Sequence, residues 1–354
     1  MRKAIVFLFA LAGTAMSGQQ TTMQVNGKIL TTVSGNEITL RGINYPIIDD
    51  GSISLANPVQ WQHKIDQAAL TGANAIRLPW YLNGTHWKDN ATPGTTQGLV
   101  NNGHLNNLLA YCHSKGMVPI VEIHNVTCSN DWSAFNGAVM NWWKSPQVLS
   151  IIEANKAYLI INLANEFGYV NWAGNATAAL QVFQTNYNQA ISSLRALNVN
   201  VPIMIDATEC GQSSTELLSI SESMVAADPA HNLIFSAHSY WLNYANSVAA
   251  IQTKLDEAAA KNVHFVLGEV ANGQDNNGCA DAPLMYETIL SEACQRNIGW
   301  LAWTYDQDCS VREMTANGEF STLTPWGNVV VHNTAFGLLN SPCAAEELSV
   351  VDRT

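Results

Sequence analysis

The feature that most constrains the fold is a set of eight short apolar segments that alternate along the chain with segments of helical periodicity. Each apolar segment has the length of one strand and little polar alternation, which is typical of a buried parallel sheet. The expected strands are 39–45, 75–80, 118–124, 158–166, 201–207, 233–240, 264–269 and 299–305. The expected helices are 58–71, 103–115, 178–197, 213–227, 247–261 and 282–296. Eight repeated β-then-α units predict an α/β fold, a closed (β/α)8 TIM barrel.

An open, doubly wound sheet is the structural alternative, but no glycine-rich phosphate-binding loop follows any expected strand. Residues 24–40 alternate apolar and polar side chains around Asn26-Gly27, which predicts a short N-terminal β-hairpin covering the entrance of the fold. We find no internal repeat and no linker-like segment. We therefore expect a single domain over residues 19–340, followed by a frayed C-terminal tail over residues 341–354.

The N-terminus has the pattern of a secretory signal peptide. Met1-Arg2-Lys3 precedes the apolar run 4–12, and small residues follow as far as Gly18. The run is too short to anchor the protein in a bilayer, and no other stretch reaches its length. We expect residues 1–18 to be removed and the mature protein to be secreted and soluble, with no membrane partner.

The charge balance of the mature chain is acidic. Without Arg2 and Lys3, 14 basic residues face 28 acidic ones, a formal charge of −14. Nucleic acids and anionic membranes both require a basic surface, so this balance argues against either as a partner. Only 12% of the residues are charged, which suits a secreted protein that acts on a neutral substrate. We also expect a monomer.

Seven cysteines follow the signal peptide, so disulfides can form and at least one thiol is left over. Cys279 and Cys309 lie just beyond two successive expected strands and are the pair that we predict. Cys112 and Cys294 fall inside expected helices, where the alternative interpretation, a buried small apolar side chain, stays open.

Two of the expected strands end on a glutamate. The segment 159–168 is a buried strand pattern that stops at Asn165-Glu166, and 263–270 closes on Glu269. Glutamate is rarely buried without a partner, and either residue alone could cap a helix or pair with an arginine. Because parallel strands end at the same face of a barrel, the two carboxyl groups are expected to face each other, as acid-assisted glycoside hydrolysis requires.

Other expected strands also end in polar or aromatic side chains. These residues are Arg77, His124, Asn165, His238, Tyr240 and Trp303. An arginine or histidine in such a position is often structural when it stands alone. With the strand that closes on Glu269, six strands end in this way and indicate a site at the C-terminal face of the barrel.

Each of these residue types has a physical role available in such a site. A nucleophilic carboxylate must stay ionised, and Arg77 and Tyr240 could favour the charged form of Glu269 by attraction and hydrogen bonding. A proton donor must keep its proton, and burial beside an ionised Glu269 would raise the pKa of Glu166. Asn165 could hydrogen-bond a sugar 2-hydroxyl.

Eleven tryptophans suggest a groove for an extended neutral polysaccharide. Trp303 offers a flat face for a sugar ring and an indole N–H for a hydroxyl. Six tryptophans fall in expected strand-end loops: Trp80, Trp132, Trp172, Trp241, Trp303 and Trp326. About half of these six are expected to pack in the core or to anchor loops. We predict substrate contacts for Trp80, Trp172 and Trp303. Loops 47–57, 82–102, 126–138 and 272–280 are expected to shape the groove.

Seven motifs occur together in order: Ile43-Asn44, 72–77, Ile123-His124, 162–166, 235–240, Leu267-Gly268-Glu269 and 299–303. On these motifs the chain, from about residue 24 to 339, resembles the retaining glycoside hydrolases of family 5, most closely the secreted endo-β-1,4-mannanases. The resemblance implies Glu166 as acid/base and Glu269 as nucleophile. It places Arg77, His124, Asn165, His238, Tyr240 and Trp303 around the scissile bond, with no cofactor and no metal.

The residues that follow the two glutamates bear on which polysaccharide is the substrate. Phe167 follows the acid/base, whereas typical cellulases of the family commonly have proline there. Val270 follows the nucleophile, where an aromatic residue and glycine are frequent in the family, which bears on the shape of the neighbouring subsite. The resemblance thus implies a β-mannanase, with an endo-β-1,4-glucanase as the near alternative.

Other classes have less support in the sequence. A carbohydrate-binding protein without catalysis would be signalled by loss of either glutamate, and both are present. A metallohydrolase lacks an H-E-x-x-H motif or clustered cysteine and histidine spacing. A serine hydrolase lacks the G-x-S-x-G elbow. A retaining mechanism predicts carboxyl groups about 5–5.5 Å apart.

Overall fold

A computed structural model describes residues 20–275, 278–339, 341–343, 345–349 and 352. Eight parallel strands close into a barrel in the order β12-β3-β4-β5-β6-β7-β8-β9, and every residue in them is buried. The strands are β3 (Arg41–Asn44), β4 (Ala75–Trp80), β5 (Val118–Ile123), β6 (Ile160–Asn162), β7 (Ile203–Asp206), β8 (Leu233–His238), β9 (His264–Val270) and β12 (Gly299–Ala302). The predicted (β/α)8 barrel and its eight strands are confirmed.

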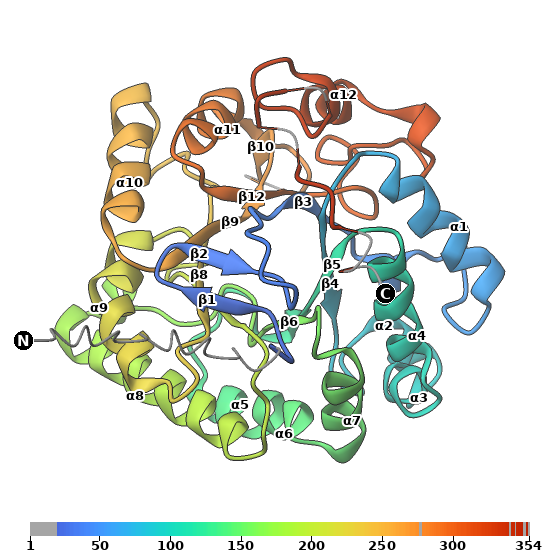
Figure 1. Ribbon diagram of the computed structural model, residues 1–354, viewed down its shortest axis with the longest axis horizontal. Helices are drawn as coiled ribbons and strands as arrows, with labels where there is room; N and C mark the ends of the chain where they lie inside the picture. The colour runs from blue at the N-terminus through green and yellow to red at the C-terminus, as the bar shows by residue number, and fades with distance from the viewer. Residues whose placement is uncertain (1–19, 276–277, 340, 344, 350–351, 353–354) are drawn as a thin grey trace, which may run out of the picture.

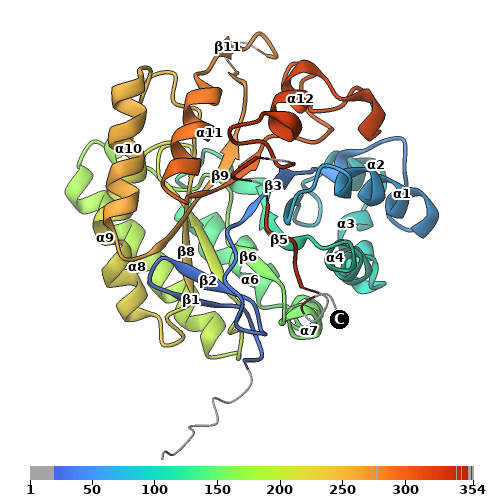
Figure 2. The ribbon, with the colours of Figure 1, turned by 45° about the horizontal axis from the view of Figure 1, so that its top comes forward.

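Helices surround the barrel (Figures 1 and 2). The larger ones are α1 (Pro58–Ala69), α4 (His104–Ser114), α7 (Pro146–Asn155), α8 (Ala176–Arg195), α9 (Ser214–Ala227), α10 (Val248–Ala260), α11 (Tyr286–Gln295) and α12 (Pro325–His332). In α8 the buried positions Phe183, Tyr187, Ile191 and Leu194 recur every three to four residues, so one stripe packs on the barrel. The Asn175 side chain caps its N-terminus by accepting the Ala178 N–H at 3.1 Å.

Helical structure also occurs where loops were predicted. The short segments are α2 (Trp87–Ala91), α3 (Thr95–Asn101), α5 (Trp132–Ala134), α6 (Met140–Trp143), the π-turn η3 (Phe135–Val139), and the 3₁₀ turns η1 (Ile47–Asp49), η2 (His124–Val126), η4 (Asn171–Ala173) and η5 (Phe320–Thr322). The prediction of plain loops over 82–102 and 126–138 is therefore wrong. The helices α7 and α12 were also missed, although each begins with proline at its first turn after a serine or threonine.

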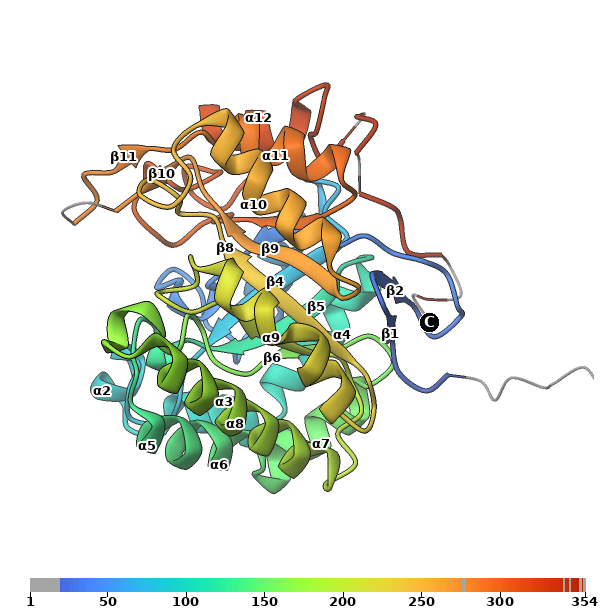
Figure 3. The same cartoon turned by 90° about the vertical axis from the view of Figure 1, so that its left-hand side faces the viewer.

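The N-terminal hairpin, β1 (Gln24–Asn26) with β2 (Ile29–Thr31), is confirmed and closes the N-terminal end of the barrel. Met23, Val25 and Leu30 are buried in a small core. Their partners there are the inward-facing residues near the strand starts: Ala75, Val118, Ile120, Ile160, Met204, Ile234, Val266 and Leu301. In Figure 3 the hairpin lies at the right of the barrel, and β10 (Gly273–Gln274) and β11 (Ala282–Pro283) lie at the left. The C-terminal strand ends are thus left clear for a site.

The described part of the C-terminal tail is docked, so the prediction that it frays is wrong for these residues. Cys343 is bonded to Cys294, and Leu348 is buried in the same small core as the hairpin. The carboxylate of Asp352 accepts hydrogen bonds from Ser34 at 2.5 Å and from Asn36 at 3.0 Å. The tail therefore ties the end of the chain to the turn after β2.

Three disulfides link described residues: Cys128–Cys210, Cys279–Cys309 and Cys294–Cys343. The predicted Cys279–Cys309 pair is confirmed, and Cys112 is a free, buried thiol as its alternative interpretation had it. Cys294 is paired instead of being an isolated small side chain. The expected signal peptide, residues 1–18, lies outside the described residues. Within the described ranges no helix is long and apolar enough to cross a membrane.

Candidate active site

A cleft of about 470 Å³ opens at the C-terminal ends of the barrel strands. Both predicted glutamates line it, together with His124, Asn165, Tyr240 and Trp303. Arg77 and His238 are fully buried, and their side chains bond to the two glutamates. The parallel barrel therefore brings these eight predicted side chains into one site.

Glu166 follows the short strand β6 and turns sharply into the cleft. Its backbone has a φ of 49°, and its N–H donates to Asp206 Oδ2 at 3.2 Å. A non-glycine residue in this left-handed region costs on the order of 1–3 kcal/mol unless its surroundings impose the conformation. Oε1 of its carboxyl group lies 2.9 Å from His238 Nδ1. The local turn thus points the side chain at His238 instead of at solvent.

Glu269 lies near the end of β9 and is 3% exposed. Arg77 Nη1 donates to its Oε1 at 2.8 Å, and the Tyr240 hydroxyl donates to its Oε2 at 2.8 Å. These are the two partners that the sequence suggested for Glu269. Both contacts favour the ionised carboxylate, which is the form that a nucleophile needs.

The two glutamates are close neighbours. A carboxylate oxygen of Glu166, one of Glu269 and a ring nitrogen of His238 all lie within 4.8 Å of one another. This spacing matches the short separation of retaining hydrolases, not the wider gap of inverting ones.

The surroundings separate the pKa values of the two carboxyl groups. Burial raises the pKa of Glu166 well above its usual range, and Glu269 and Asp206 raise it further. Burial raises the pKa of Glu269 as well, to about 7, although Arg77, His124 and Tyr240 oppose the rise. When the pair holds one proton, that proton lies on Glu166 and the negative charge lies on Glu269.

His238 can approach Glu166 because its neighbours are glycines. A Cβ on Gly211 would lie 2.8 Å from the imidazole, and one on Gly268 would lie 3.1 Å from its Nε2. Burial lowers the pKa of His238 well below its usual range, and the positive charges of Arg77 and His124 lower it further. His238 is thus a neutral hydrogen-bond partner for Glu166.

Arg77 is the buried centre of the site. Besides Glu269, its guanidinium donates to Asn162 at 2.9 Å, Asn44 at 3.0 Å and Asn165 at 2.6 Å. Arg77 occupies one acceptor position of the Asn165 amide oxygen, so that oxygen and the amide nitrogen of Asn165 can both still bond a sugar hydroxyl. That nitrogen also donates to Thr127 at 2.9 Å.

Two acidic residues below the cleft were missed in the sequence. Glu122 and Asp206 are fully buried, 3.8 Å and 3.4 Å from the Arg77 guanidinium. Glu122 also bonds His124 Nδ1 at 2.6 Å and, against the effect of burial, raises the pKa of His124. An acidic residue within an apolar strand pattern was the signal that could have revealed them.

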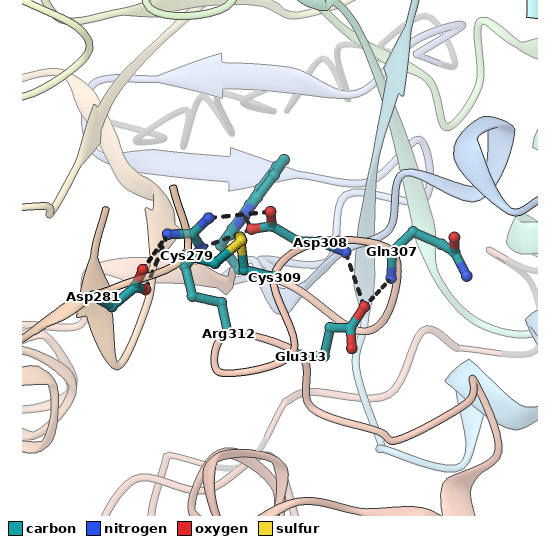
Figure 4. Close-up of a disulfide and its surroundings, with 8 residues drawn as sticks. Cys279, Asp281, Gln307, Asp308, Cys309, Arg312 and Glu313 are labelled. Carbon is teal, nitrogen blue, oxygen red and sulfur yellow. Dashed lines mark hydrogen bonds and ion pairs between the residues drawn. A yellow bond between two sulfur atoms is a disulfide. The ribbon is translucent and has the colours of Figure 1, made fainter. Parts of the chain in front are cut away.

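Trp303 is held by a network that the sequence did not reveal (Figure 4). Its indole N–H donates to Asp308 at 2.6 Å, and its ring stacks 5.9 Å from His124. Arg312 binds Asp308 at 2.7 Å and Asp281 at 2.9 Å, next to the Cys279–Cys309 disulfide. The predicted bond from this indole N–H to a sugar hydroxyl is therefore wrong, and the ring face is left for contact.

The two other predicted tryptophans lie apart from the cleft lining. Trp80 is 1% exposed, so the prediction that it contacts substrate is wrong. Apolar packing at the end of β4 explains its burial. Trp172 is 53% exposed on η4 and packs edge-on against Tyr169 at 5.2 Å. Its contact with substrate stays a prediction. Trp87 is equally exposed on α2 and was not singled out.

Two groups of described residues have three potential metal-ligating atoms close together. One contains Cys128 and Cys210, whose sulfurs are bonded to each other and so offer no thiolate. The other is Glu166, His238 and Glu269, next to the positive charge of Arg77. The chemistry of paired carboxyl groups needs no metal, and the expectation of no cofactor stays a prediction.

The fold and the site together define a class of protein. A (β/α)8 barrel with two buried glutamates in close contact at its C-terminal face is the architecture of a retaining glycoside hydrolase. A family model described as "Cellulase (glycosyl hydrolase family 5)" matches residues 31–308. The chain belongs to glycoside hydrolase family 5.

Named relatives lie within this family. A mannan endo-1,4-beta-mannosidase from Salipaludibacillus agaradhaerens is 27% identical over 315 residues, which cover 87% of this chain and 90% of the relative. A solved mannohexaose complex of a β-mannanase from Thermomonospora fusca has a TM-score of 0.74 at 21% identity, covering 94% of this chain and all of that one. An endoglucanase catalytic domain from Thermobifida fusca, solved with cellotetraose, has a TM-score of 0.55 at 18% identity. The match covers 90% of this chain and 94% of that one.

Proposed function

We propose that this protein is a secreted, retaining endo-β-1,4-mannanase that hydrolyses internal bonds of mannan-type polysaccharides. The observation that carries the proposal is the pair Glu166 and Glu269, in close contact and with opposite electrostatic surroundings. The name of the Salipaludibacillus relative supports mannan as the substrate.

The geometry supports a double displacement. Glu269, held ionised by Arg77 and Tyr240, attacks the anomeric carbon while Glu166 gives its proton to the leaving oxygen. Once the leaving sugar departs, the charge on the covalently bound Glu269 is gone, so the pKa of Glu166 falls and Glu166 becomes the base that activates water. The anomeric configuration is retained because the sugar is inverted twice.

Around this pair, neighbouring side chains take supporting roles. His238 bonds the Glu166 carboxyl group and fixes its direction. Asn165 keeps a second amide hydrogen to donate to a sugar 2-hydroxyl, and the Trp303 ring lies flat against His124 as a wall of the cleft. The aromatic face suits the apolar face of a sugar ring.

Two further parts of the proposal rest on sequence. Export is supported by the signal-peptide pattern of residues 1–18, and a monomer that binds neither nucleic acid nor membrane is supported by the acidic balance. An endo-β-1,4-glucanase is the second candidate, because the matching family model carries the description of a cellulase. The better structural agreement with a β-mannanase favours the first.

The test compares product release from β-mannan and from soluble β-1,4-glucan by the wild type, Glu269→Ala and the exposed control Glu153→Ala. We expect mannan hydrolysis with retained configuration in the first products, a loss on the order of 10⁴-fold or more in Glu269→Ala, and no change in the control. Release from glucan alone would assign the enzyme to the glucanases. Unchanged activity of Glu269→Ala would overturn the nucleophile.

A further inference from the structure

The acid Glu166 has an unusual neighbour on the side away from His238. Cys128 Sγ lies 3.3 Å from Glu166 Oε2. This sulfur is bonded to Cys210 and carries no proton, so it cannot donate a hydrogen bond. Both cysteines line the cleft beside the acid. One oxygen of the carboxyl group therefore faces an apolar, polarisable atom where solvent or a donor would otherwise stand.

The same disulfide joins the two loops that hold the backbone around Glu166. On one side, Ser129 O accepts the Gly168 N–H at 2.8 Å, and Cys128 O accepts the Tyr169 hydroxyl. On the other side, the Glu209 N–H donates to Gly168 O at 3.0 Å. The loop after β5 and the loop after β7 thus clamp the segment that follows Glu166, and the disulfide fixes their separation.

Backbone conformation around the clamp is costly. Cys128, Glu166, Glu209 and Cys210 are non-glycine residues with φ between 49° and 54°. Such residues persist only where the surroundings impose the conformation. The covalent link between the two loops supplies such a constraint directly beside the acid.

We propose that the Cys128–Cys210 disulfide is a positioning element for the acid Glu166, which holds the carboxyl group in place and keeps its Oε2 free of hydrogen-bond donors. The inference rests on the proposed function, since it assumes that Glu166 is the proton donor. Replacing the two sulfurs by serine hydroxyl groups would supply hydrogen-bond donors to the ionised carboxylate of Glu166. Donors to the ionised form lower the pKa of a carboxyl group, so the acid would lose its proton at lower pH.

Other charged or titratable groups also act on Glu166 and stay constant in the test. They are Arg77, Glu122, Asp206, His238, Tyr240 and Glu269, from β4, β5, β7, β8, the loop after β8, and β9. None of them is altered by changing the two cysteines. A shift in the titration of Glu166 would then report the disulfide itself.

The experiment measures kcat/KM against pH for the wild type, Cys128→Ser/Cys210→Ser, Cys128→Ala/Cys210→Ala, and the control Cys294→Ser/Cys343→Ser. The control removes a disulfide that lies outside the cleft. A hydrogen bond to a charged group corresponds to a pKa change of about 1 unit or more. We expect the alkaline limb of the serine pair to move down by about 1 pH unit, the alanine pair to move less, and the control to keep the wild-type limb.

Two results would overturn the proposal. If the alkaline limb of kcat/KM falls at the same pH in all four proteins, the disulfide is a purely structural link. Equal shifts in the serine and alanine pairs would overturn the exclusion of hydrogen-bond donors from Oε2, because loss of the crosslink alone would then change the acid. If the cysteine variants do not fold, the folded wild type is treated with dithiothreitol, which is oxidised as the S–S bond becomes two thiols. Alkylation and mass spectrometry locate the opened bond, and an unchanged pH profile with Cys128–Cys210 open would equally overturn the proposal.

A second readout separates this inference from the proposed function. Carbon NMR of labelled glutamate carboxyl groups, with Glu166→Gln to assign the signal, follows the pKa of Glu166 directly. A lower pKa in the serine pair supports the inference even if neither glycan is hydrolysed. An unchanged pKa of Glu166 in the serine pair contradicts the inference even if mannan is hydrolysed.

Discussion

At the scale of single residues, the site works by giving two chemically identical side chains different surroundings. Glu269 receives hydrogen bonds from Arg77 and Tyr240, whereas Glu166 faces His238 and a disulfide sulfur. Neither of these neighbours brings a positive charge to Glu166, since His238 is held neutral by burial and the sulfur is uncharged. The distribution of donors therefore supports the proposed roles, with Glu269 as the nucleophile and Glu166 as the acid.

Tyr240→Phe tests this distribution. The hydroxyl lowers the pKa of Glu269, so its loss raises that pKa and leaves less ionised nucleophile at low pH. We expect the acid limb of the kcat/KM profile to move up by about 1 pH unit, with the alkaline limb unchanged. Tyr111→Phe is the matched control, because that hydroxyl also bonds a carboxylate, Asp66, but on the outer helices. An acid limb that stays in place would mean that Tyr240 does not set the charge of Glu269.

At the scale of elements, the loops after the strands position side chains that the strands alone do not. The loop after β12 carries Asp308 and Arg312, which fix the Trp303 ring in the cleft, and the disulfide to Cys279 ties it to the segment after β9. Figure 4 shows Arg312 between Asp281 and Asp308, beside this disulfide. The wall of the cleft opposite Glu166 is therefore a crosslinked unit.

Arg312→Ala should loosen that wall. It removes the cation between Asp308 and Asp281 and leaves two carboxylates without their partner. We expect KM for mannan to rise about tenfold, which corresponds to 1.4 kcal/mol, with a smaller effect on kcat. Arg296→Ala is the control, since Arg296 also bridges two acidic residues, Asp256 and Glu292, but on the helical exterior. Equal KM values for wild type and Arg312→Ala would show that the network does not hold Trp303 for substrate.

At the scale of the whole molecule, the N-terminal hairpin and the described part of the C-terminal tail meet at the closed end of the barrel. The hairpin packs on the strand starts, and the tail bonds to the turn beside it through Asp352. Burial alone would raise the pKa of Asp352, but hydrogen bonds from Ser34, Ser349, Thr32 and Asn36 lower it to about 2. The chain end thus contributes stability that depends on ionisation of one carboxyl group.

Asp352→Asn should lower the thermal midpoint by a few degrees at neutral pH. Because the folded pKa is depressed, this stabilisation is fully present above the unfolded value of about 4 and is lost as the pH falls toward 2. Thermal unfolding followed from pH 7 to pH 2 should show the two curves converging at acid pH. The exposed control Asp256→Asn should track the wild type throughout. A constant difference at every pH would mean that the charge of Asp352 is not what stabilises the end of the chain.

Much of this molecule could be predicted from the sequence. Eight apolar runs were enough for the barrel, because strand periodicity and length are local properties. Glu166 and Glu269 stood out because a carboxyl group that ends a buried strand is costly. The motifs around them gave the family that the comparison then identified.

What only the tertiary structure decided depends on contacts between distant segments. The Cys128–Cys210 pair spans 82 residues and joins two loops whose approach follows from barrel closure. The burial of Trp80, the use of the Trp303 indole N–H by Asp308, and the docking of Asp352 likewise depend on which neighbours the fold supplies. Residue type and spacing determined which groups could do the chemistry. Three-dimensional packing determined which of their atoms are free to do it.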